Sequence, residues 1–196
     1  MTEDHHQNHE AANKGAVSPP VLTSLYEELL LKKGELLLTA RSGSMTPLIR
    51  IGDKVKVRTT STEAIGFGDI IVFREEEKLV IHRVVAKGKL ERQPFFLQKG
   101  DRSSFPFRIP AQCVLGTVFE IHKPSRCILL NSRKWRFLNL LLAVRSYLTC
   151  FTQPNLPARE RALLGNRKYQ LLHCVFSFLI LPLRLSRRLK ARKHVE

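Results

Sequence analysis

The stretch GDIIVFREEEKLVIHRVVAKG, residues 68–88, places runs rich in valine and isoleucine on either side of three glutamates. Apolar, β-branched runs of this length favour strands, and a short polar cluster between two of them indicates a hairpin. Shorter segments of similar character occupy residues 35–40, 54–59, 94–101 and 113–121. The sequence therefore predicts a compact, mainly β domain of five to seven short strands. Gly116, inside the last of these strands, is expected to mark a bulge or a close approach of backbone.

The segments on both sides of these strands differ in composition. Residues 1–20 are polar and lack an apolar run, so we expect a disordered leader with neither a secretory signal nor an N-terminal membrane anchor. Residues 21–34 carry leucines at helical spacing and end at Gly34, which predicts a short amphipathic helix. After Lys123-Pro124 the chain becomes rich in leucine and arginine. We therefore expect a leader over 1–20, a β domain over 21–122 and a basic helical extension over 123–196.

The net charge of +16 is concentrated in that extension. Residues 121–196 contain 16 of the 33 Lys and Arg residues but 2 of the 17 Asp and Glu residues. An apolar run over 171–183 is too short for a bilayer span, which needs roughly 20 residues. Basic amphipathic helices over 132–193 would suit an anionic membrane surface. A helical pair packed on the β domain is the alternative, and nucleic acid is not expected as a partner. The chain would then be peripherally membrane-associated or cytoplasmic.

Cysteine and histidine give little indication of a metal site. Cys113, Cys127, Cys150 and Cys174 are widely spaced, without the C-x-x-C pairs of zinc or redox sites. They are interpreted as idle thiols. His5, His6 and His9 lie in the polar leader, where a solvated tail is the simpler interpretation. No metal or organic cofactor is expected.

The segment RSGSMTPL, residues 41–48, holds the first candidate for chemistry. A serine hydroxyl becomes nucleophilic when a base takes its proton and when donors stabilise the oxyanion that forms. Gly43 can adopt unusual backbone angles and so present Ser44 on a sharp turn. Ser42 could add a second oxyanion donor beside the Ser44 amide. Taken alone, the segment is better explained as an ordinary surface turn.

Two further segments supply the partners that such a serine requires. His82 lies mid-strand in VIHRVV, and an imidazole titrates near neutrality, which suits a general base. Alternation places it on one strand face with Val80 and Val84. Asp101, in the LQKGD segment of residues 97–101, could orient the imidazole as the third member of a triad.

These segments in this order resemble the type I signal peptidase family over about residues 35–121. The matching segments are SGSMTPLIRIGDKVKV, GDIIVF, VIHRVV, LQKGD and VLGTV. The resemblance implies a signal-peptidase/LexA-like β fold and cleavage of an extended peptide or precursor protein. It implies Ser44 as nucleophile, Ser42 as oxyanion donor, and His82 as base, as in the histidine-type members. It also implies shallow pockets for small residues, which Met45 could line.

The chain departs from the family pattern in two respects. The histidine-type enzymes usually carry another acidic residue soon after the K-G-D segment, and residues 102–108 contain none. The family usually has an apolar anchor ahead of the serine, and none is seen here. The leading hypothesis is a serine endopeptidase. The alternative is a catalytically silent module of the same fold that binds a membrane surface or a peptide, and a self-cleaving repressor-like peptidase ranks third.

Overall fold

The computed structural model describes residues 19–151 together with Ala158 and Leu164. In this part of the chain the structure is mainly β with a helical extension, which confirms the predicted fold class. In chain order the elements are α1 (Pro19–Lys33), β1 (Glu35–Thr39), β2 (Lys54–Arg58), β3 (Ile70–Glu75), β4 (Lys78–Leu90), β5 (Gln93–Lys99), β6 (Phe107–Pro110), a 3₁₀ turn η1 (Ala111–Cys113), β7 (Val114–Lys123), β8 (Arg126–Leu129) and α2 (Arg133–Phe151).

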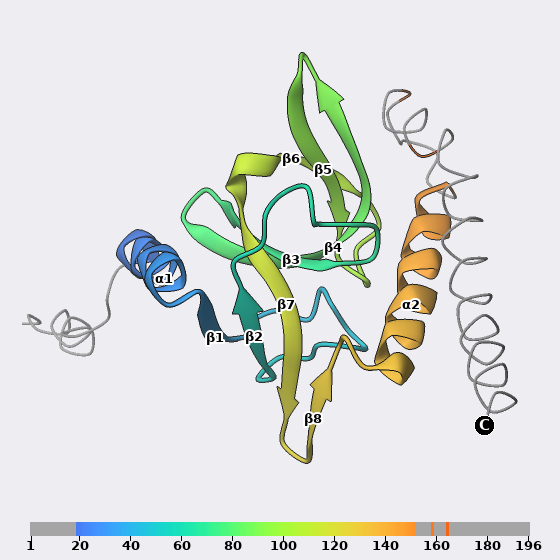
Figure 1. Cartoon of the computed structure of the whole chain (residues 1–196). Coiled ribbons are helices and arrows are strands. Elements are labelled where there is room, and N and C mark those ends of the chain that lie inside the picture. Colours follow the sequence, from blue (N-terminus) through green and yellow to red (C-terminus); the bar gives the residue numbers. More distant parts are fainter. Residues whose placement is uncertain (1–18, 152–157, 159–163, 165–196) are drawn as a thin grey trace, which may run out of the picture.

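The strands form one antiparallel sheet that curls into a half-barrel (Figure 1). The strand order is β1-β2-β7-β3-β4-β5-β6, and β8 pairs with the C-terminal part of β7. The long β4 lies between β3 and β5, with His82 opposite Ile71 and Arg83 opposite Lys99. This register brings the middle of β4 beside the end of β5, where the turn at residues 99–101 follows.

The side chains of β4 alternate between different parts of the core, as the sequence predicts. Val80 and Val84 pack in one apolar cluster, whereas Ile81 and Val85 belong to two others. His82 shares the face of Val80 and Val84, and its ring lies 6.0 Å from that of Phe73. Arginine at position 83 therefore points to the opposite side of the sheet from the imidazole.

Gly116 is both a bulge site and a point of close approach, as predicted. The register between β3 and β7 shifts at this point. A Cβ at position 116 would lie 2.1 Å from the carbonyl oxygen of Arg58, a distance that no side chain tolerates. Glycine is therefore required here because β2 and β7 come together too closely for any larger residue.

Two short strands were not predicted from the sequence. β6 and β8 have four residues each, too few for a clear alternation pattern. The boundary expected between residues 122 and 123 falls at the end of β7, inside the hairpin with β8. The residues around Pro124 form the turn of that hairpin and do not link two separate parts.

The helix α2 packs against the sheet along one side. Ala143, Ser146, Tyr147 and Cys150 are buried there, and the Tyr147 hydroxyl donates a hydrogen bond to the carbonyl of Leu164. Lys99, at the end of β5, donates to the Thr149 hydroxyl at 3.0 Å. The first helix of the expected extension is thus joined to the β domain. Its other side exposes Phe137, Leu141 and Leu148.

No helix among the described residues is long and apolar enough to cross a membrane. The described residues do not include residues 1–18 of the predicted leader 1–20, the apolar run 171–183 or most of the basic segment 132–193 beyond α2.

Candidate functional site

The loop between β1 and β2 carries Ser44 and is anchored at both ends and in its middle. The backbone N–H of Ala40 donates to the carbonyl of Asp53, and that of Gly52 donates to the carbonyl of Ala40. Leu48 and Ile49 are buried in the core beneath the loop. Gly43 does not adopt the left-handed backbone angles that were expected, and a turn closed by its carbonyl and the Thr46 N–H presents Ser44 instead.

Ser44 and His82 lie within hydrogen-bond distance although 38 positions separate them in the chain. The Oγ atom of Ser44 is 3.2 Å from Nε2 of His82. This is the geometry that a serine nucleophile and its general base require.

The other imidazole nitrogen contacts Gln98, a residue that was not predicted to be part of the site. Nδ1 of His82 lies 2.5 Å from Oε1 of Gln98, which is buried in β5. An amide oxygen only accepts, so Nδ1 carries the proton and Nε2 of the neutral ring is left to accept the Ser44 hydroxyl proton. Ser44 then donates to His82, and Ser42 Oγ, at 3.3 Å, donates to Ser44 Oγ.

The sequence predicts that Asp101 orients the imidazole, but Asp101 does not contact it. Its carboxylate forms two hydrogen bonds with the guanidinium of Arg83, each of 2.7 Å, and accepts a third from Ser146 at 3.0 Å. Arg83 also donates to the side chain of Asn139 and to the carbonyl of Gly68. Arg83 and Asp101 are both buried, so this ion pair joins β4, the turn after β5 and α2.

The turn that follows β5 holds the Ser44 loop against His82. The N–H of Arg102 donates to the carbonyl of Ser44 at 2.8 Å. A Cβ at Gly100 would lie 2.9 Å from that carbonyl oxygen and 3.0 Å from Nε2 of His82. The glycine of the K-G-D segment is therefore a close-approach residue, and it leaves room for the serine and the histidine to meet.

Burial sets the protonation of the imidazole. Desolvation lowers the pKa of His82 below its ordinary value of 6.5, and the hydrogen bond to Gln98 opposes that effect, as do the charges of Glu75 and Asp101. The neutral ring, which is the form that can accept a proton from Ser44, is therefore favoured at neutral pH.

The structure places the other two predicted site residues, Ser42 and Met45, in different surroundings. Ser42 is exposed next to Ser44, where a hydroxyl can reach an oxyanion on the outer side of the loop. Met45 is 2% exposed and belongs to the largest apolar cluster. It is a core residue here, so its expected place in a substrate pocket is not supported by the structure.

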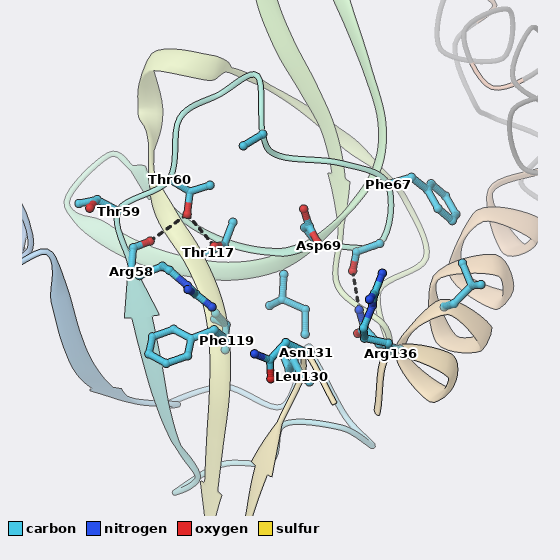
Figure 2. A pocket seen from close by; sticks show the side chains of 16 residues that line it. Arg58, Thr59, Thr60, Phe67, Asp69, Thr117, Phe119, Leu130, Asn131 and Arg136 are labelled. Atoms are coloured by element: carbon cyan, nitrogen blue, oxygen red, sulfur yellow. Dashed lines mark hydrogen bonds between the residues drawn. The ribbon is translucent and has the colours of Figure 1, made fainter. Parts of the chain in front are cut away.

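A cavity of about 730 Å³ lies between the β2–β3 connection, β7 and α2 (Figure 2). Thr60 and Thr117 are hydrogen-bonded to one another on its wall, and the guanidinium of Arg58 stacks over Phe119. Ser44 and His82 do not line it. Gly68 and Asn139 of its wall contact Arg83, on the opposite side of the sheet from His82.

Comparison with known proteins adds no further assignment. No model of a known protein family matches the chain, and no curated protein matches its sequence.

Gln98 could have been identified from the sequence as a neighbour of the histidine. In the register of β4 and β5 it lies opposite Val84, on the strand face that His82 shares. A carboxylate is the more familiar partner of an imidazole base, so the sequence pattern favours Asp101 over this amide.

Proposed function

We propose that this protein is a serine endopeptidase similar to the histidine-type signal peptidases. The observation that carries the proposal is the 3.2 Å separation between Ser44 Oγ and His82 Nε2. A hydroxyl on an anchored loop beside a half-buried neutral imidazole is the minimum arrangement for acyl transfer. Five sequence segments in the order of that family give independent support.

In the proposed reaction His82 Nε2 takes the proton of Ser44 while Oγ attacks the carbonyl carbon of a peptide bond. The Ser44 amide and the Ser42 hydroxyl would stabilise the oxyanion of the tetrahedral intermediate. His82 then gives its proton to the leaving amine, and an acyl-enzyme remains. In the second half His82 takes a proton from water, the resulting hydroxide attacks the ester, and His82 returns that proton to Ser44 Oγ as the acyl product leaves.

Gln98 replaces the acid that usually orients the base in such sites. Its amide oxygen fixes the tautomer and the ring direction of His82 but adds no full negative charge beside the imidazolium. Neutral amides have this role in the Cys-His-Asn variants of the triad. Arg83 and Asp101 would act one layer further out by holding β4, the turn after β5 and α2 together.

A peptide cleavage assay tests this proposal. The purified chain is incubated with extended peptides that carry small residues before the scissile bond. Ser44→Ala is expected to abolish cleavage, whereas Ser42→Ala should lower it by about 10²-fold if that hydroxyl stabilises the oxyanion. Ser61→Ala, at an exposed position between β2 and β3, is the matched control and should be unaffected. Cleavage that persists in Ser44→Ala would overturn the proposal.

The alternative is a catalytically silent module of the same fold, favoured by the absence of a carboxylate at the imidazole in the described residues. The two functions are separated by His82→Ala. An enzyme would lose its activity, while a binding module would keep its biological role.

We further propose that the basic segment 132–193 contacts an anionic membrane surface. The exposed Phe137, Leu141 and Leu148 of α2, together with its basic residues, support this proposal. Flotation of the full chain with phosphatidylserine vesicles tests it. Arg187→Glu/Arg188→Glu/Lys190→Glu should weaken binding at least tenfold, while Lys78→Glu/Lys89→Glu/Arg92→Glu, on exposed parts of β4 and the next turn, should not. An equal loss of vesicle binding in both variants would contradict a membrane-binding surface located in the basic segment.

A further inference from the structure

Three potential metal ligands of different chemistry converge on the β7–β8 hairpin, away from Ser44. His122 on β7 lies directly opposite Cys127 on β8. Glu120 precedes His122 by two positions, so it projects from the same face of β7. One oxygen of Glu120, one nitrogen of His122 and the sulfur of Cys127 all lie within 4.8 Å of one another.

The contacts in this cluster centre on the carboxylate. Oε1 of Glu120 lies 2.9 Å from Nε2 of His122 and accepts a hydrogen bond from the Cys127 thiol at 2.8 Å. Nε2 of His122 is shielded from solvent, yet it makes no properly oriented hydrogen bond with any described residue. A solvent-shielded ring nitrogen that lies 2.9 Å from a carboxylate oxygen without a properly oriented hydrogen bond is left unsatisfied, and a cation bound between the two groups would satisfy it.

We propose that Glu120, His122 and Cys127 form a binding site for one Zn²⁺ ion. Sulfur, imidazole nitrogen and carboxylate oxygen together suit zinc, whereas Mg²⁺ and Ca²⁺ prefer oxygen ligands alone. Tetrahedral zinc bonds of about 2.0–2.3 Å keep ligand atoms roughly 3.3–3.8 Å apart. The contacts of 2.8 and 2.9 Å therefore have to open by about 1 Å or less.

Zinc binding would replace the proton that Cys127 now donates to Glu120. The thiol loses this proton to solvent, the sulfur binds as thiolate, and the carboxylate oxygen is freed for the metal. Thiolate and carboxylate together neutralise the ion's charge. The nearby Lys56 is held by Glu35 at 2.9 Å, so its ammonium is engaged elsewhere. Because Cys127 is exposed, water can reach the ion as a fourth ligand.

The site would tie the β7–β8 hairpin together and so support the start of α2. The Leu130 N–H donates to the carbonyl of Phe119, and Ser132 bonds the carbonyl of Leu129 immediately before the helix begins. Arg126 of β8 stacks over Trp135 in the first turn of α2. Asn139 and Ser146 of α2 in turn hold Arg83 and Asp101. A metal at the hairpin would therefore stabilise the elements that surround the candidate active site.

The experiment uses the full chain with His5, His6 and His9 each changed to Gln, which removes the histidines of the leader. Titration with Co²⁺, followed by competition with Zn²⁺, reports both stoichiometry and ligand type, because a thiolate bound to Co²⁺ gives a charge-transfer band. We expect one ion per chain with such a band. Cys127→Ser should abolish the band, and His122→Gln should weaken binding at least tenfold. Cys113→Ser is the matched control and should bind normally.

A second measurement does not depend on the spectrum. Zn²⁺ should raise the thermal unfolding temperature of the control Cys113→Ser but not that of Cys127→Ser. The same band or the same rise in Cys127→Ser would place the metal elsewhere and overturn the proposal. The absence of binding at 100 μM Zn²⁺ would overturn it as well.

Discussion

Oε1 of Gln98 lies 2.5 Å from Nδ1 of His82, in the position where a serine peptidase usually has a carboxylate. The buried amide fixes which imidazole nitrogen faces Ser44, but it supplies no full charge to stabilise an imidazolium. The candidate site therefore combines a well-oriented base with weak electrostatic stabilisation of the imidazolium that this base would form. This combination leads to predictions that differ from those for a Ser-His-Asp site.

Substitution of Gln98 should change both the rate and the pH profile of Ser44 modification by a fluorophosphonate, a reaction that needs no known substrate. Gln98→Leu leaves Nδ1 without an acceptor and should lower the rate by about 10²-fold. Gln98→Glu places a negative charge beside the ring, raises the pKa of His82 and should shift the acidic limb of the profile to higher pH. An unchanged profile in Gln98→Glu would show that this residue does not act through the imidazole.

The lowered pKa of His82 should also appear in the stability of the fold. Because the folded-state pKa lies below 6.5, the unfolded chain binds more protons as the pH falls through that range. The contribution of His82 to stability is therefore full above about pH 6.5 and decreases as the pH falls through the folded-state pKa. Urea unfolding between pH 7.5 and 5 should show a smaller decrease for His82→Gln than for the parent chain. Identical pH dependence would contradict the assigned burial effect.

Separating the buried ion pair should destabilise the protein strongly. Arg83→Met leaves the Asp101 carboxylate buried without its partner, and we expect a loss of about 3–5 kcal/mol in the free energy of unfolding. Asp101→Leu should be similarly costly. The double variant should recover much of that loss, because it leaves no unpaired charge. Additive losses, measured by urea unfolding, would show that the two residues are not coupled.

Gly100→Ala tests whether the turn after β5 makes room for Ser44 and His82 to meet. The added methyl group would press on the Ser44 carbonyl and on His82, so the rate of Ser44 modification should fall at least tenfold. Gly66→Ala is the matched control, since its nearest neighbour would be 3.8 Å away and the rate should be unaffected. Equal rates in both variants would mean that the loop and the histidine do not depend on this close approach.

Several parts of the structure could be predicted from the sequence because they depend on local patterns. The alternation in VIHRVV fixed the face of His82, and the β-branched runs indicated the strands of the central sheet. The proximity of Ser44 to His82 was expected only through the resemblance to a family, since nothing local joins residues 38 positions apart.

Other features depended on tertiary contacts that no local pattern reveals. The sequence predicts Asp101 as the orienting acid because a carboxylate is the usual partner of a base, but Arg83 binds this carboxylate with two charge-assisted hydrogen bonds. For a similar reason, the packing of α2 on the β domain was only the alternative interpretation. Its leucines and arginines suggested a separate arm, whereas the buried Ser146 shows that one side of the helix faces the core.

Mass spectrometry of the intact chain after fluorophosphonate treatment tests the central claim most directly. The account predicts one covalent adduct, located on Ser44, that forms in the parent chain but is absent from Ser44→Ala and at least 10²-fold slower in His82→Ala. An adduct that forms at the same rate without His82, or a parent chain that remains unmodified while correctly folded, would contradict the proposed transfer of a proton from this serine to this histidine.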